Sequence, residues 1–205
     1  LEWTTDQMLE DAGESVIAVR PVQPHGVSEL LVSVPDHNGL FASIVSVLDQ
    51  MGLDVMSARV LTTRDGYSYD LFQVMDQHGH VINTADADDL VERLRVATAE
   101  EAPGVSVRRK TPRRLKHFTT DTRVAFREDP DGRGTVLHLT CRDRPGLLSR
   151  IAAAIVDGNL QVHSARIATF GEKVEDTFLI SDQENRPLSS EDMESLEDGI
   201  RENLD

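Results

Sequence analysis

The sequence predicts an α+β protein made of two copies of one small domain, each a four-stranded antiparallel sheet with two helices on one face. Two observations carry this prediction: the sequence repeats itself, and each repeat alternates β-rich runs with helical periodicities. A shift of 107 residues, from Asp36 to Asp143, places the first repeat on the second, and Ser-Ala-Arg at 57–59 then matches Ser-Ala-Arg at 164–166. A repeat of this length indicates a duplicated domain.

The first repeat opens with two strands joined by turn residues, at 16–19 and 30–34. Apolar residues then recur every four positions from Leu40 to Leu48, which is the buried stripe of an amphipathic helix that Gly52 ends. Two further strands and a second helix follow. The strands are expected at 55–62 and 67–75, and the helix carries Leu90, Leu94 and Ala97.

The second repeat follows the same ββαββα order. Its strands are expected at 123–127, 136–141, 162–169 and 174–181, and its helices carry Leu147, Ile151 and Ile155, then Met193, Leu196, Ile200 and Leu204. A ferredoxin-like sheet has the order βαββαβ, but no residues remain here for a closing strand. We therefore predict a circularly permuted ferredoxin-like sheet, in which 16–19 and 124–126 are edge strands paired antiparallel with the strand that follows each. The expected domains are 15–100 and 122–205, with a leader or linker at 1–14 and an interdomain linker at 101–121.

Composition limits the function classes. The net charge of −15 argues against nucleic acid as a partner. The single cysteine, Cys141, excludes an intramolecular disulfide and is expected to be a small core residue, which suits a reducing cytoplasm. No apolar run approaches the ~20 residues of a membrane span, and no signal peptide is recognised. Because the chain begins with Leu1, we expect a piece of a longer protein.

The segment between the repeats is strongly basic, with six Lys or Arg among residues 108–116. It is either a site for an anionic partner or a linker that lies across the acidic domains, and we favour the linker.

The loop before the first helix of each repeat is where binding chemistry is expected. It brings the backbone N–H groups of Gly39-Leu40 or Gly146-Leu147 to a helix N-terminus, where free donors and the helix dipole suit a carboxylate. Asp36 or Asp143 then meets the ammonium group of a ligand, or merely caps its helix. The two roles are compatible, and the sequence leaves them open.

The run Asp143-Arg144-Pro145-Gly146-Leu147-Leu148 resembles the signature of ACT domains, small modules that bind amino acids and regulate the proteins that carry them. Three further segments extend the resemblance: 62–66 followed by Asp70, 115–118, and 171–176 followed by Phe178. In this order they are similar to the C-terminal tandem ACT region of the bifunctional uridylyltransferase/uridylyl-removing enzymes, and the resemblance covers nearly the whole chain.

The resemblance implies a function. In that family one catalytic domain attaches a nucleotide to the PII signal protein, a metal-dependent domain removes it, and the ACT pair senses glutamine and decides which activity runs. It implies L-glutamine as effector, Mg²⁺ for the catalytic half, UMP or AMP as the transferred group, and PII and the catalytic domains as partners. Neither catalytic half is recognised here, so no catalytic residue, metal ligand or cofactor is expected in this chain. The alternative is a module without a small ligand that dimerises through its sheets or helices or docks PII.

In ACT domains the start of the following strand often contributes to the ligand site. The resemblance therefore suggests that Gln161 and Asn159 bind a ligand's side-chain amide; the alternative is that they only form a surface turn. The candidate binding residues are Asp36, Asn38, Gly39, Leu40, Asp54, Val55, Asp143, Arg144, Pro145, Gly146, Leu147, Asn159, Leu160, Gln161 and Val162. The first loop lacks the proline of the second, so we expect the Gly146 loop to be the better organised of the two.

Turn lengths also suggest two cross-strand charge pairs. A four-residue turn at 63–66 places Arg59 opposite Asp70, and a three-residue turn at 170–172 places Arg166 opposite Asp176. Such a pair contributes about 0.2–1 kcal/mol.

Overall fold

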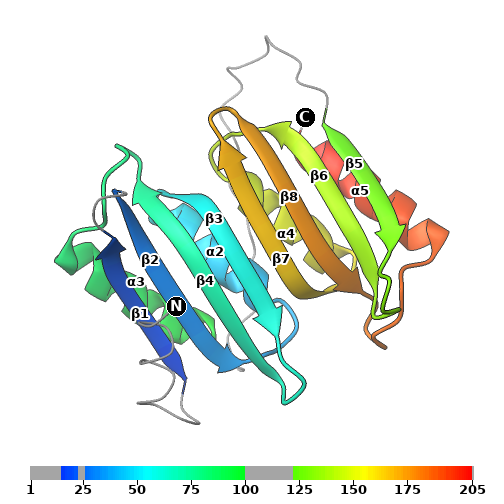
Figure 1. Cartoon of the computed structure of the whole chain (residues 1–205), viewed down its shortest axis with the longest axis horizontal. Helices are drawn as coiled ribbons and strands as arrows, with labels where there is room; N and C mark the ends of the chain where they lie inside the picture. The colour runs from blue at the N-terminus through cyan, green and yellow to red at the C-terminus, as the bar shows by residue number, and fades with distance from the viewer. Residues whose placement is uncertain (1–14, 23–25, 100–121, 205) are drawn as a thin grey trace.

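A computed structural model describes residues 15–22, 26–99 and 122–204. Among these residues eight strands form one antiparallel sheet, and four helices cover one of its faces (Figure 1). The first repeat contributes β1 (Val16–Val22), β2 (Val27–Pro35), α2 (Leu40–Gln50), β3 (Leu53–Thr62), β4 (Tyr67–Asp76) and α3 (Thr84–Ala97). The second contributes β5 (Arg123–Glu128), β6 (Thr135–Arg142), α4 (Leu147–Asp157), β7 (Gln161–Phe170), β8 (Lys173–Ser181) and α5 (Ser190–Leu204).

The strand order confirms the permuted topology. It runs β1-β2-β4-β3-β7-β8-β6-β5, so each repeat holds four neighbouring strands in mirrored positions. The leading strands β1 and β5 are the two edges, and each pairs antiparallel with the strand that follows it in sequence. In each repeat the leading strand occupies the place that the closing strand holds in a ferredoxin-like sheet.

The two repeats join along their inner strands. β3 and β7 pair antiparallel from Ser57 opposite Ala168 to Leu61 opposite Ser164, which makes one continuous sheet. Behind it, the Phe41 ring meets the Phe178 ring edge-on, with centroids 5.9 Å apart and planes at 73°. Edge-to-face pairs of this kind stabilise a contact beyond their buried area. The apolar core is accordingly one cluster shared by both repeats.

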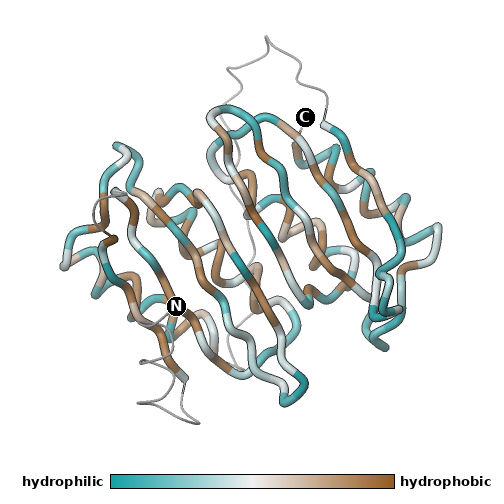
Figure 2. Tube along the Cα trace, in the orientation of Figure 1, coloured by the Kyte–Doolittle hydropathy of each residue, from teal (hydrophilic) through white to brown (hydrophobic). Residues whose placement is uncertain are grey.

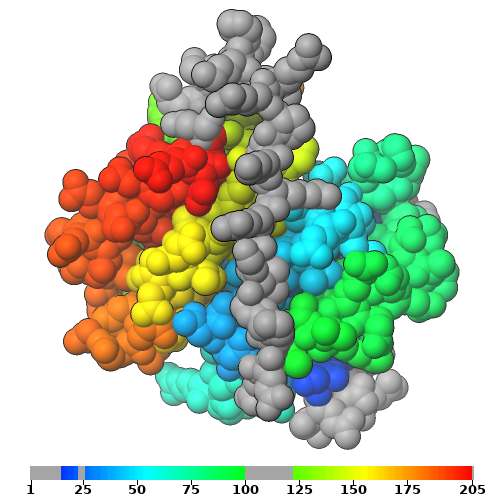
Figure 3. Space-filling model, turned by 180° about the vertical axis from the view of Figure 1, so that it is seen from behind, coloured from blue at the N-terminus to red at the C-terminus, as the bar shows by residue number. Residues whose placement is uncertain are grey.

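The helices differ in burial according to their position. Seen from behind, α2 and α4 occupy the middle of the helical face, while α3 and α5 lie at its two ends (Figure 3). Residues 40–48 of α2 are all buried, because the sheet and both neighbouring helices surround them. The peripheral α3 buries only Leu90 and Leu94. Apolar and polar positions alternate along the strands, as Figure 2 shows, so that one side of each strand faces the helices.

The predicted charge pair between Arg59 and Asp70 is wrong. Thr63 pairs with Tyr67 through the Thr63 N–H, 2.8 Å from the Tyr67 carbonyl oxygen, so the turn holds three residues instead of four. Gly66, with φ 81°, supplies the left-handed residue that such a loop needs. The register moves by one, Val60 lies opposite Asp70, and the Arg59 side chain falls on the open face. A one-residue slip exchanges the two faces of a strand.

The same correction applies to Arg166 and Asp176. Phe170 pairs with Lys173 across a two-residue turn, so Arg166 lies opposite Thr177 and Ala165 opposite Phe178. Arg166 is exposed on the open face, whereas Asp176 is 2% exposed beneath the helices. In both repeats the carboxylate therefore points into the protein.

Several expectations stay open or have simple outcomes. The leader at 1–14 and the linker at 101–121, including its basic run, lie outside the described residues, and the domain boundaries remain predictions. Cys141 is fully buried in the core, as expected, and burial raises the pKa of its thiol to about 11. None of the described helices has the length and apolar character that crossing a membrane requires.

Candidate functional site

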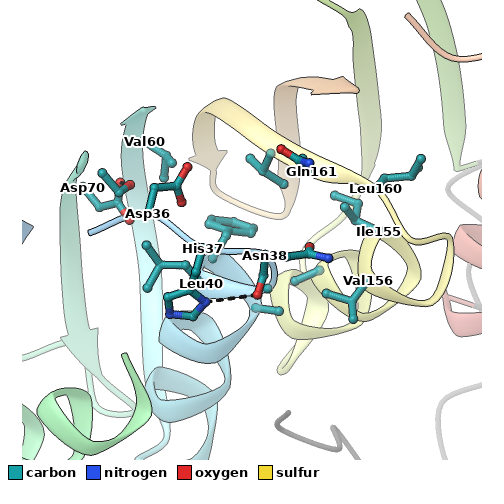
Figure 4. Close-up of a pocket in the computed structure, with 16 residues that line it drawn as sticks. Asp36, His37, Asn38, Leu40, Val60, Asp70, Ile155, Val156, Leu160 and Gln161 are labelled. Atoms are coloured by element: carbon teal, nitrogen blue, oxygen red, sulfur yellow. Dashed lines mark hydrogen bonds between the residues drawn. The ribbon is translucent and has the colours of Figure 1, made fainter. Parts of the chain in front are cut away.

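A cavity lies where the two repeats meet on the helical side of the sheet (Figure 4). Its volume is about 140 Å³. The first repeat contributes residues 36–42, Val60, Ser68 and Asp70, and the second contributes Ala152, Ile155, Val156 and 160–162. We call it the inter-repeat cavity. A space of this size is well below the 300–1,000 Å³ of pockets for drug-sized ligands and suits a molecule no larger than an amino acid.

The N-terminus of α2 forms one wall of the cavity. Gly39 is the N-cap residue, in the left-handed conformation with φ 82°, and no side chain caps the helix. Leu40 N–H donates to the His37 carbonyl oxygen at 3.1 Å, whereas the next two N–H groups of the helix have no acceptor within it. Asp36 does not cap, since its Oδ2 accepts a hydrogen bond from Thr62 Oγ1 at 2.9 Å. The capping role that the sequence left open for Asp36 is therefore wrong.

Two carboxyl groups lie together at one end of the cavity. Asp36 comes from the loop before α2, and Asp70 comes from the middle of β4, as Figure 4 shows. Ser68 Oγ donates to Asp70 Oδ1 at 2.6 Å, while Asp70 Oδ2 is buried without a hydrogen-bond partner among the described residues. Burial raises the pKa of Asp70 to about 7, with a further contribution from the charge on Asp36. This end offers acceptors for a positive group.

Carboxamide side chains lie at the rim formed by the second repeat. Gln161 Nε2 donates to two oxygens of Gln183, the backbone carbonyl oxygen at 3.3 Å and the side-chain Oε1 at 3.4 Å. Asn38 Nδ2 donates to the same Oε1 at 3.4 Å, across the junction between the repeats. Gln183 Nε2 in turn donates to the Asn159 carbonyl oxygen at 2.8 Å. These long, shared contacts leave amide groups able to exchange partners with a ligand.

The cavity gathers about half of the residues that the sequence nominated. Those that line it are Asp36, Asn38, Gly39, Leu40, Leu160, Gln161 and Val162. Asn159 stands just behind, in the turn between α4 and β7, with φ 54°. The others belong to the loop before α4, the first residue of α4 or the start of β3, and they do not line the cavity: Asp143, Arg144, Pro145, Gly146, Leu147, Asp54 and Val55.

The counterpart region, made of the loop before α4 and the start of β3, has different chemistry. Asp54 stands at the repeat position of Gln161, so a carboxylate replaces a neutral amide. Burial raises the pKa of Asp54, and the charge on Asp143 raises it further. Arg144 Nη1 donates to the Leu204 carbonyl oxygen at the end of α5. A Cβ atom at Gly146 would lie 3.3 Å from Asp49 Oδ1, so this loop is packed against the protein itself.

Sequence reasoning missed the inward-facing part of the cavity. Every second residue of β4 from Ser68 is buried, so Ser68 and Asp70 share the inner face of the strand with Phe72 and Val74. The two-residue spacing between Asp70 and Phe72 is a signal that could have placed Asp70 on the inner face, because residues two apart in a strand share a face. The contribution of Ala152, Ile155 and Val156 depends on the packing of α4 beside α2, which no local pattern encodes.

Comparisons with known proteins describe the chain's relatives. A family model for the ACT-like domain of plant bHLH transcription factors matches residues 130–196. Aspartate kinase from Synechocystis is 18% identical over 88% of this chain and 28% of its own, with a TM-score of 0.47. The regulatory subunit of aspartate kinase from Thermus thermophilus is 14% identical over 94% of this chain and all of its own, with a TM-score of 0.30. These two likenesses are too weak to carry an argument.

Sequence similarity to curated enzymes is much stronger. A bifunctional uridylyltransferase/uridylyl-removing enzyme of Xanthomonas axonopodis pv. citri is 38% identical over all of this chain and 24% of its own length. The enzyme of the same name from Vibrio atlanticus is 31% identical, again over all of this chain and 24% of its own length. The chain thus spans about a quarter of the length of the relatives it matches. The resemblance drawn from the sequence motifs is confirmed: the chain is related along its whole length to a region of the bifunctional uridylyltransferase/uridylyl-removing enzymes.

Proposed function

We propose that this chain is a glutamine-sensing regulatory module, and that the inter-repeat cavity holds one molecule of L-glutamine. The observation that carries the proposal is the order of groups around the cavity. Free N–H donors of α2 suit an α-carboxylate, Asp36 and Asp70 suit an α-ammonium group, and Asn38 and Gln161 suit a side-chain carboxamide. The apolar side chains of Ile155, Val156 and Leu160 border the remaining wall.

The position of the cavity supports a route by which ligand occupancy could reach other domains. Its walls come from both repeats, so a bound ligand adds contacts between α2 of the first repeat and α4 and β7 of the second. A ligand shifts a conformational equilibrium only by its difference in affinity for the two states. Closure of the junction around glutamine is such a difference, and the regulated domains need only sense the angle between the repeats.

The proposal includes a longer enzyme, as the relatives' names suggest. In it, glutamine binding here sets the balance between uridylyl transfer to the PII signal protein and uridylyl removal, and the catalytic domains of the same chain are the direct partners. Among the described residues no three or more His, Cys, Asp or Glu side chains are placed to hold a metal ion. The Mg²⁺ that the family resemblance implies for the catalysis belongs, in this proposal, to those other domains.

Calorimetric titration of the 205-residue chain with amino acids tests the ligand. We expect glutamine to bind. Glutamate should bind more weakly, because its side-chain carboxylate replaces the carboxamide at the amide rim and adds a negative charge to a cavity that already holds two aspartates. Asparagine should also bind more weakly, because its shorter side chain does not reach Gln161. Thermal melting in millimolar ligand provides a second readout, because a ligand that binds only the folded state must stabilise it.

A flat titration with every amino acid would contradict the sensor. Analytical ultracentrifugation and pull-down with PII would then decide for the alternative, a module that dimerises or docks PII without a small ligand. Equal binding of glutamine and glutamate would retain an amino-acid site but remove the assigned role of the amide rim.

A further inference from the structure

We infer that Asp70, on β4, is the buried acceptor of the ligand's ammonium group, and that binding of that group releases one proton from Asp70 to the solvent. This inference deepens the proposed function and rests on it. Its consequence is that the sensor reads ligand concentration and pH together.

The geometry sets Asp70 apart from every other carboxyl group at the junction. It is the fully buried carboxyl group that lines the cavity, at 0% exposure. One oxygen is held by Ser68, which fixes the side chain, and the other, Oδ2, has no hydrogen-bond partner among the described residues. A buried polar atom without a partner costs stability, so a position that retains one calls for an explanation. An ammonium group in the cavity supplies the missing donor.

The surroundings of Asp70 favour a bound proton in the absence of ligand. Burial is the main cause that raises its pKa to about 7, and it outweighs the lowering effect of the hydrogen bond from Ser68 and of the Leu61 backbone; the charge on Asp36, on the loop before α2, adds to the rise. Val32 on β2 and Val60 on β3 face it as uncharged neighbours, and α2 contributes Leu40 and Phe41 to the same cavity.

Two histidines lie in the vicinity. His163 on β7 interacts with Asp36, and its own pKa is lowered, chiefly by burial. His37 lines the cavity, and its ring nitrogens contact the Asn38 and Thr98 carbonyl oxygens. Among the residues that the structure describes, the cavity lining contains no Lys or Arg side chain.

The coupling has a defined sign. An ammonium group pairs with the ionised carboxylate, and the protonated acid must first lose its proton to buffer; no covalent bond other than this O–H changes. Below the pKa of free Asp70, affinity therefore rises with pH, up to about tenfold per unit, and it levels off above about pH 8. Close to one proton is released per ligand at pH 6, and almost none at pH 8.

Calorimetry in two buffers of different ionisation enthalpy measures the released protons directly. We expect the 205-residue chain to release about one proton per bound glutamine at pH 6 and to bind glutamine about tenfold more tightly at pH 8 than at pH 6. Glutaramic acid, which is glutamine without its amino group, should release none. Asp70→Asn should weaken binding at pH 8 and abolish both proton release and pH dependence.

Asp176→Asn is the matched control. Asp176 occupies the same position in the second repeat, is buried, and lies outside the cavity, so the variant should release protons as the parent chain does. Glutamine binding without proton release at pH 6 would overturn the inference and leave the proposed function standing. Release that persists in Asp70→Asn would assign the proton to another group. Failure of glutamine to bind at either pH would remove the proposed function and this inference with it.

Discussion

Asp176 allows a direct test of the electrostatics of the core. It lies 2% exposed on β8, neither carboxyl oxygen has a hydrogen-bond partner among the described residues, and burial raises its pKa to about 7. Aspartate in an unfolded chain titrates near ~3.9. Between these two values the folded state holds a proton that the unfolded state has lost, so this carboxyl group's contribution to stability falls as pH rises from about 4 to 7.

The magnitude follows from the two pKa values. Each carboxyl group with such a shift removes about 2 kcal/mol of unfolding free energy between pH 5 and pH 7. Asp176→Asn abolishes the titration. We therefore expect the stability advantage of the variant over the parent chain to grow by about 2 kcal/mol between pH 5 and pH 7, which corresponds to several degrees in melting temperature.

Urea unfolding of both chains at pH 5, 6, 7 and 8 measures the effect. The difference between the two chains is the relevant quantity, because other titrating groups cancel in it. His138 and His163 require this cancellation: burial lowers their pKa values, so their contribution to stability rises with pH over part of the same range. A stability difference that stays constant from pH 5 to pH 8 would show that Asp176 is ionised throughout and would refute the reasoning.

Three further predictions concern the junction. Gly39→Ala and Gly146→Ala should each destabilise the fold by about 1–2 kcal/mol, because both glycines have positive φ values, 82° and 73°. Only Gly39→Ala should weaken glutamine binding in a titration, since of the two glycines only Gly39 lines the cavity. Gln161→Glu should lower glutamine affinity about tenfold, because it gives the rim the carboxylate that Asp54 supplies in the counterpart region; unchanged affinity would exclude Gln161 from the site. Phe41→Ala should cost about 3–5 kcal/mol in urea unfolding, whereas Phe170→Ala, at 65% exposure, should change stability by no more than about 0.5 kcal/mol.

The topology was predictable because it depends on the repeat and on periodicity. Because the repeat aligns Asp36 with Asp143, each element predicted in one repeat was supported by its counterpart in the other. With no residues left for a closing strand, β1 and β5 were the strands able to complete each sheet. These inferences need residue spacing alone. They do not depend on the geometry of any one turn.

Register was not predictable at the same level, because it depends on how many residues a turn consumes. Because Thr63 N–H donates to the Tyr67 carbonyl oxygen, the first turn holds one residue fewer than the sequence predicted, and Arg59 and Asp70 lie on opposite faces of the sheet. The error affected the candidate site, since the predicted register hid the inward orientation of the Asp70 carboxyl group. The two-residue spacing from Phe72 was the better guide to the orientation of the Asp70 side chain.

The sequence nominated the corresponding loops of both repeats for the site, and the tertiary arrangement gives them different surroundings. β3–β7 pairing brings α4 beside α2, so the Gly39 loop faces Gln161, whereas the Gly146 loop packs on Asp49 near Asp54. Pro145 suggested that the second loop would be better organised, but rigidity alone does not open a cavity. Which of the two loops lines the cavity depends on neighbours that lie far away in the sequence.

A crystal structure of the chain with L-glutamine tests the central claim most directly. The account predicts one ligand per chain in the inter-repeat cavity, with its carboxylate at the N-terminus of α2, its ammonium group between Asp36 and Asp70, and its carboxamide at Gln161. Glutamine bound instead beside Asp143 and Gly146, or an empty inter-repeat cavity under conditions where calorimetry detects binding, would contradict it.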